Sequence, residues 1–239
     1  MTAKETIKTK LDRLRRQSRE TGQVQLSASA VTLGAEAAIH FLLAAVLSGV
    51  SLPDGGAPFG VALAAAAGSG VCGGAAMLGA CFGSLCLLGI SQRMRHAAAA
   101  ILTFAVAFAF YDVKLFRRSW TMPFIAALLN AFTGSVLLVR TGWEGTDLFS
   151  LSLEALMTAG AAWCYRGVLL PMRTRREDRL VSPVRRAGLL VLLSTLLMSL
   201  APLRLFGQIS LGGCLAVLGV LSAAWQGGPS AGAVVGVTM

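Results

Sequence analysis

The sequence predicts an all-α fold, a polytopic transmembrane helical bundle, and three observations lead to that prediction. Of its 239 residues, 55% are hydrophobic and 13% are charged, against roughly 25% charged residues in soluble domains. The charges gather in short basic segments between long apolar ones, which is typical of a multi-span membrane protein. The net charge of +10 therefore indicates contact with the anionic head groups of a lipid bilayer, and nucleic acid is not an expected partner.

Residues 1–29 form a polar, basic tail ahead of the first apolar segment. Ile7, Leu11 and Leu14 would share one face of a short helix in this tail. Two roles fit it: a cytoplasmic tail that orients the first span, or a helix that lies on anionic lipid. Residues 30–239 form the predicted transmembrane helical domain.

Polar side chains inside the predicted spans are candidate functional positions, because a charge inside a bilayer is costly. Glu36 and His40 lie four residues apart in the first span, from about Ala30 to Leu52, and share one helical face. Asn130 and Glu154 lie in later spans. Hydrogen-bonded links between helices and an ion or proton relay are the two roles that we weigh for these residues.

The uncharged segment Ala57–Ser91 decides on which side all later loops lie. It contains 35 residues, with a cluster of glycines from Gly68 to Gly74. The cluster predicts a turn between two short spans, at about residues 57–71 and 73–90. Stripes of small residues let helices pack closely. The small residues in such stripes, here and near the C-terminus, are Gly60, Ala64, Gly68, Gly79, Gly83, Gly232 and Gly236.

Five further apolar segments complete the predicted spans. They cover about residues 97–110, 119–139, 148–170, 187–203 and 209–225. The sequence GGPS then predicts a turn into another apolar segment, residues 231–239, which is shorter than the roughly 20 residues that a span needs. We therefore expect a truncated ninth span and a chain that is a fragment of a longer protein.

The distribution of Lys and Arg gives the orientation. With two crossings in Ala57–Ser91 and a cytoplasmic N-terminus, 17 Lys and Arg residues lie inside and four outside. With a single crossing, the numbers are 11 and 10. The positive-inside rule favours the first arrangement, which has eight complete spans. Its most basic cytoplasmic loop, Met172–Arg186, contains Arg173, Arg175, Arg176, Arg179, Arg185 and Arg186.

No catalytic, metal-binding or nucleotide-binding motif is found in the sequence. The five cysteines all lie in apolar segments and form no Cys-x-x-Cys pair, so we interpret them as small packing residues. The residues alone therefore predict no catalytic group and no cofactor for this chain.

Four stretches carry a family resemblance: APFGVALAAAAG, YDVKLFRRSWTMPFIAALLNAFTGS, LSLEALMTAGAAW and GGPSAGAVVGV. Together with the order and spacing of the spans from about residue 30 onward, they resemble the N-terminal membrane domain of stage II sporulation protein E. That family belongs to endospore-forming Firmicutes. The resemblance implies a membrane anchor in the cell membrane, multi-pass, at the polar sporulation septum, with self-association.

The resemblance also implies what would lie downstream. In the family, a central cytoplasmic region binds the tubulin-like division protein. A C-terminal serine phosphatase of the protein phosphatase 2C type, with manganese or magnesium, dephosphorylates an anti-sigma-factor antagonist and so activates the first forespore sigma factor. The chain ends before these domains, so no catalytic residue is carried over. A polytopic transporter or channel core is the alternative function, and an enzyme that acts on lipid is a third.

Overall fold

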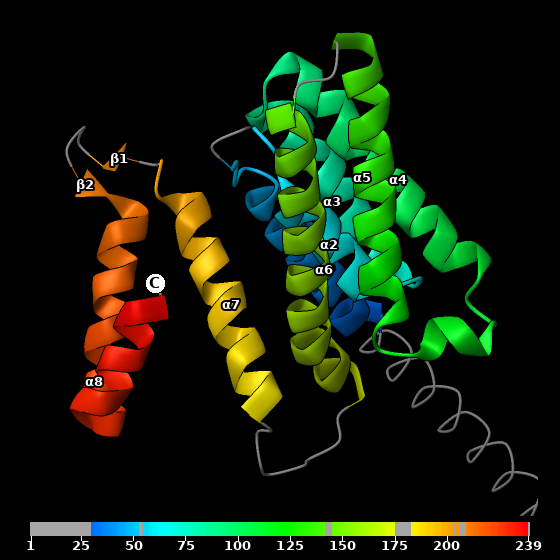
Figure 1. The fold of residues 1–239 in the computed structure, drawn as a ribbon. Helices are drawn as coiled ribbons and strands as arrows, with labels where there is room; N and C mark the ends of the chain where they lie inside the picture. The colour runs from blue at the N-terminus through cyan, green and yellow to red at the C-terminus, as the bar shows by residue number, and fades with distance from the viewer. Residues whose placement is uncertain are drawn as a thin grey trace, which may run out of the picture.

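The computed structural model describes residues 30–52, 55–141, 145–174, 183–202, 204–205 and 209–238, and nearly all of them are helical (Figure 1). The all-α prediction is therefore confirmed for this part of the chain. The basic tail, residues 1–29, lies outside it. The elements in chain order are an N-terminal helix (Ala30–Leu47), α2 (Pro58–Ala67), α3 (Val71–Leu87), α4 (Ile90–Ala109), η1 (Lys114–Arg117), α5 (Thr121–Thr141), α6 (Gly145–Thr174), α7 (Pro183–Leu200), β1 (Arg204–Leu205), β2 (Ile209–Ser210) and α8 (Leu211–Thr238).

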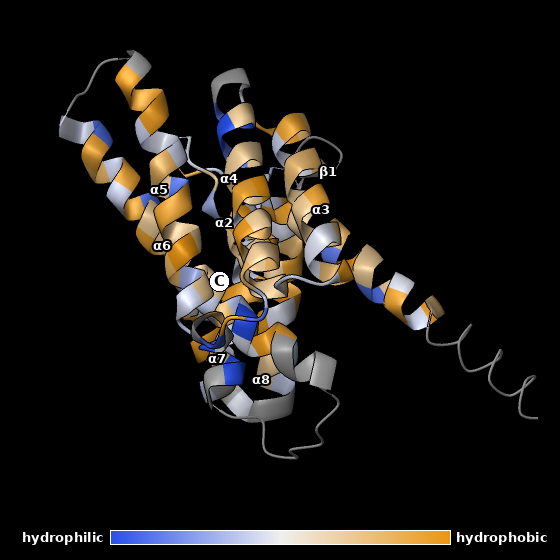
Figure 2. Ribbon diagram, turned by 90° about the vertical axis from the view of Figure 1, so that its right-hand side faces the viewer, coloured by the Kyte–Doolittle hydropathy of each residue, from blue (hydrophilic) through white to orange (hydrophobic). Residues whose placement is uncertain are grey.

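Apolar residues run along most of these helices (Figure 2). Two helices of the described part are long and apolar enough to cross a membrane, at Ala30–Leu47 and Thr121–Val139, and three shorter ones are also apolar. The described part of the chain is therefore a helical protein of membrane character, and it does not show the predicted eight spans. The clearest difference is α2. Its ten residues reach about 15 Å at 1.5 Å per residue, half of the roughly 30 Å hydrocarbon core.

The predicted break inside Ala57–Ser91 is confirmed as a break between two helices. Pro58 occupies the start of α2, where its missing N–H leaves no hydrogen bond unmade. The helix ends before Gly68, whose φ of +79° favours a residue without a Cβ atom. A new helix, α3, then begins at Val71.

The short helix α2 lies at the centre of the bundle. All ten of its residues are buried, and it contacts α3, α4, α5 and α6. Its sequence, PFGVALAAAA, is apolar on every side, as expected of a helix that is enclosed all round. Ala64, one of the predicted packing residues, has no exposed surface.

Backbone-to-backbone contact joins α3 to the N-terminal helix. A Cβ atom on Gly79 would lie 2.9 Å from Cα of Phe41, and one on Gly83 would lie 2.8 Å from Cα of Ala45. Each would also collide with the carbonyl oxygen of the same residue. Because the two contacts are one helical turn apart on both helices, the G-x-x-x-G stripe of α3 packs directly against the N-terminal helix.

The other predicted small residues have different surroundings. A Cβ atom on Gly60 would collide with the side chain of Ser48 at the end of the N-terminal helix. Gly68, in contrast, has no neighbour within 4 Å of that position. Gly68 instead has the positive φ that ends α2, and its packing role stays a prediction.

The last two helices form the edge of the bundle (Figure 1). Helix α7 packs on α6, and α8 packs on α7. Helix α8 bends at Gly228, which has a φ of +80°, in agreement with the predicted turn at GGPS. The segment after the bend returns along α8. A Cβ atom on Gly232 would lie 2.7 Å from Cβ of Ala224, and one on Gly236 would make only ordinary contacts with Val220.

Candidate functional site

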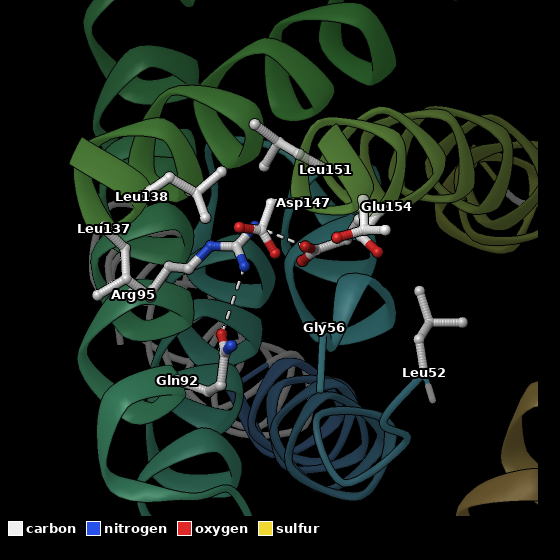
Figure 3. Close-up of a pocket in the computed structure, with 12 residues that line it drawn as sticks. Leu52, Gly56, Gln92, Arg95, Leu137, Leu138, Asp147, Leu151 and Glu154 are labelled. Carbon is white, nitrogen blue, oxygen red and sulfur yellow. Dashed lines mark hydrogen bonds and ion pairs between the residues drawn. The ribbon is translucent and has the colours of Figure 1, made fainter. Parts of the chain in front are cut away.

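Polar side chains from α4 and α5 converge on Glu154 of α6. The Glu154 side chain is 4% exposed and pairs with Arg95 of α4, which is 9% exposed. The Arg95 guanidinium donates to Oε2 of Glu154 at 2.5 Å (Figure 3). Nδ2 of Asn130, in α5, donates to the other carboxylate oxygen at 3.0 Å. The buried charge of Glu154 is thus compensated by a cation and a neutral donor.

The N-terminus of α2 adjoins the same carboxylate. A Cβ atom on Gly56 would lie 2.8 Å from the carboxyl carbon of Glu154, so only glycine leaves room for that group. A helix N-terminus carries a partial positive charge, and α2 has no side-chain cap of its own. The position of Glu154 is therefore favourable both for the carboxylate and for α2.

His96 follows Arg95 in α4 and is 2% exposed. The backbone N–H of Ala57 donates to Nε2 of His96 at 3.1 Å. A nitrogen that accepts a hydrogen bond carries no proton, so the imidazole is neutral with its proton on Nδ1. The same Nε2 atom lies 3.7 Å from Oε1 of Glu154, which completes the ring of groups around the carboxylate.

Secondary contacts hold these groups in place. Nδ2 of Asn130 also donates to Oγ1 of Thr158 at 3.0 Å, and that hydroxyl donates to the backbone carbonyl of Glu154 at 2.8 Å. On the other side, Arg95 donates to the side-chain carbonyl of Gln92 at 3.3 Å. Helices α4, α5 and α6 are therefore tied together through one carboxylate.

A cavity of about 310 Å³ adjoins the Arg95–Glu154 pair and is also lined by Gln92 and Asp147 (Figure 3). Gly134 of α5 makes room for the pair, since a Cβ atom there would lie 2.9 Å from the central carbon of the Arg95 guanidinium. Nε of Arg95, Nδ1 of His96 and Oδ1 of Asn130 are buried without a protein hydrogen bond. Buried polar atoms of this kind commonly bind water.

Glu36 and His40 lie apart from this cluster, near the other end of α2. His40 Nδ1 is 2.7 Å from the backbone carbonyl of Glu36, which requires its proton on that nitrogen. Both residues line a mostly apolar cavity of about 380 Å³ together with Ala66 and Ala67, the last residues of α2. The four intramembrane polar candidates thus form two separate groups, one at each end of α2.

Arg95 and His96 are the main functional positions that sequence reasoning missed. It placed them between the predicted spans at residues 73–90 and 97–110, whereas both lie in the first turns of α4, where His96 is buried and the Arg95 side chain is 9% exposed. A signal was available, because a carboxylate inside an apolar helix requires a partner of opposite charge. Arg166, inside the predicted span at about residues 148–170, lines a third cavity beside Gly68, at the C-terminal end of α2.

The predicted basic loop is described only at its ends. Arg173 belongs to the end of α6, and Arg185 and Arg186 belong to the start of α7, where Arg186 is exposed. Arg175, Arg176 and Arg179 lie outside the described residues.

The contacts around Glu154 are those of a buried ion-pair network between helices. Within the part of the chain that the structure describes, no group of three or more His, Cys, Asp or Glu residues is placed to hold a metal ion. In comparisons with known proteins, no family model matches the chain, and no curated protein or solved structure matches it either.

Proposed function

We propose that the chain is a multi-pass membrane domain that anchors an enzyme, with a cytoplasmic N-terminus and eight membrane helices, of which α2 is too short to be a complete span. By its resemblance to stage II sporulation protein E, the anchored enzyme is a sporulation serine phosphatase at the polar septum. The anti-sigma-factor antagonist, the tubulin-like division protein and a divalent metal would then bind to domains downstream of this chain.

The exposed apolar surface is the observation that carries the proposal. Phe124, Leu128 and Phe132 follow one another every four residues on α5 and are 67%, 59% and 60% exposed. On α8, Trp225 is 92% exposed. Soluble monomers rarely expose continuous apolar surface of this kind, whereas the hydrocarbon of a bilayer covers it without cost.

The ends of the bundle support the proposed orientation. Lys114, Arg118 and Arg186 lie in the α4–α5 connection and at the start of α7, and all three are exposed. These segments lie at the lower end of the bundle in Figure 1, whereas the α5–α6 connection and the β1–β2 pair lie at the upper end. The helices therefore run in alternate directions, as the count of Lys and Arg requires of a cytoplasmic lower end.

Labelling of single cysteines tests the orientation. In a variant without the five native cysteines, Gly145→Cys and Arg186→Cys place one thiol at each end of the bundle. We expect a membrane-impermeant maleimide to label position 145 in intact cells and position 186 only after lysis. Labelling of position 186 in intact cells would refute the orientation, and release of the chain by alkaline carbonate would refute membrane insertion.

Microscopy tests the septal part of the proposal independently. A fluorescent protein fused to the N-terminus should form a band at the polar septum of a sporulating cell. A uniform signal around the whole membrane would remove septal targeting and leave the anchoring role.

A transporter or channel core is the second candidate, and the position of α2 favours it. Short helices that end inside a bundle often face ion or substrate sites, and α2 has cavities at both ends. Glu154→Gln would then abolish an ion flux into proteoliposomes without disturbing assembly. The absence of any flux from the unmodified protein would exclude this candidate.

A further inference from the structure

The cavity at the C-terminal end of α2 has a volume of about 410 Å³ and lies at the opposite end of α2 from Glu154. Its wall combines the end of α2 and the following turn with residues of α4, η1, α5 and α6. The lining residues with polar side chains are Ser69, Tyr111, Asp112 and Arg166.

Arg166 is the unusual member of this wall. The residue is only partly exposed, and its Nε atom is buried without a hydrogen-bond partner. Neither ion pair found among the described residues involves Arg166. The C-terminal end of α2 carries a partial negative charge of roughly half a unit, which compensates only part of the Arg166 charge. A partly buried cation with so little compensation provides a binding position for an anion.

The surroundings of the cavity add positive charge. Phe116 of η1 lines the cavity, and the exposed residues Lys114 and Arg118 lie two positions before and after it. Asp112 is the acidic residue of the described wall, and it is exposed. Apolar side chains, Phe116 and Met122, complete the site, so a bound anion would have apolar surface beside it.

We propose that this cavity binds the phosphate group of an anionic phospholipid, with Arg166 as its main donor. The hydroxyl groups of Tyr111 and Ser69 supply further donors, and Phe116 and Met122 lie against the apolar part of the lipid. Basic pockets between membrane helices on the cytoplasmic side bind such head groups. The assignment of this phosphate group to a lipid rests on the proposed membrane function.

Lipid titration followed by native mass spectrometry tests the site. The full chain in neutral detergent is titrated with dioleoylphosphatidylglycerol, and the dissociation constant of the first bound lipid is measured. Arg166→Gln should raise that constant about tenfold, because a charge-assisted hydrogen bond is lost. The matched variant Arg186→Gln removes an exposed cation from the same end of the bundle and should change the constant by less than about twofold.

Further variants and ligands sharpen the test. Asp112→Asn, at an exposed position, should tighten binding because it removes a repelling charge, and Arg166→Lys should bind with intermediate affinity because it keeps only the charge. Dioleoylphosphatidylcholine should bind more weakly than phosphatidylglycerol. Equal effects of Arg166→Gln and Arg186→Gln, or an unchanged Asp112→Asn, would overturn the site.

Inorganic phosphate distinguishes a lipid head group from a free anion as the ligand of this cavity. Binding of millimolar phosphate with the same dependence on Arg166 would overturn the lipid assignment in favour of a free anion. Alkaline carbonate distinguishes the two proposals. A chain that resists extraction but lacks the Arg166 effect refutes this site alone, whereas an extracted chain refutes the membrane function.

Discussion

Helices α2 and α8 are both almost purely apolar, yet they occupy opposite environments. Every residue of α2 is buried, whereas Val217, Leu218 and Leu221 of α8 are each 60% exposed. In Figure 1, α2 lies inside the bundle and α8 lies at its edge. Apolar composition therefore identifies a helix that avoids water, but it does not say whether protein or lipid surrounds that helix.

The largest expected effect comes from the ion pair at the N-terminal end of α2. Glu154→Leu leaves the Arg95 guanidinium buried without its partner, which should lower the free energy of unfolding by about 3–5 kcal/mol. Unfolding by SDS in mixed micelles, followed by circular dichroism, measures the loss. The double variant Arg95→Leu with Glu154→Leu should lose much less, and equal losses would show that the unpaired charge is not the cause.

A matched pair of leucines tests the contrast between the two helices directly. Leu63 of α2 has no exposed surface, and Leu218 of α8 is 60% exposed. Leu63→Ala should lower the free energy of unfolding by about 2–5 kcal/mol because it leaves a cavity. Leu218→Ala should change it by less than about 0.5 kcal/mol. Similar losses in the same titration would mean that protein encloses α8 as well.

Glycines give a smaller effect with a clear control. Gly79→Leu forces α3 away from the backbone of the N-terminal helix and should cost about 1–3 kcal/mol. Gly160, on α6, has no neighbour within 4 Å of an added Cβ atom. Gly160→Leu should therefore be neutral or slightly stabilising, since leucine forms helices better than glycine. Normal membrane levels and stability for Gly79→Leu would contradict the close contact.

The smallest expected effect on stability concerns the hydrogen bond that joins α7, at the edge of the bundle, to α6. The buried hydroxyl of Tyr165, in α6, shares a 2.7 Å hydrogen bond with Thr195 of α7. Tyr165→Phe should lower the free energy of unfolding by about 0.5–1.5 kcal/mol. Ser222→Ala, which removes an exposed hydroxyl bonded within α8, should leave it unchanged. If both variants behave alike, the link between α6 and α7 contributes nothing to stability.

Local features of the fold were predictable from the sequence. The glycines from Gly68 onward predicted the break between α2 and α3, and GGPS predicted the bend at Gly228, because both sequences disfavour a continuous helix. The length of α2 was not predictable in the same way. An apolar run carries no signal for where the neighbouring helices end. In the structure these neighbours enclose all ten residues of α2.

The candidate site was predictable only in part. Glu154 and Asn130 stood out because each is polar within an apolar segment. Arg95 and His96 did not, since a basic residue beside a predicted span normally faces water. Gly134 leaves room for Arg95, and Gly56 leaves room for its partner Glu154. Both glycines lie far from these residues in sequence, and only the packed arrangement brings them together.

The shortness of α2 has a consequence for the order in which the protein is built. At about 15 Å, α2 is too short to be recognised and released into the bilayer as an independent segment. Its carboxylate partner and much of its enclosing surface belong to α6, which the ribosome makes long after α2. The centre of the bundle can therefore be completed only after α6 has been made, and a nascent chain that stops before α6 leaves α2 without its carboxylate partner and without much of the surface that encloses it.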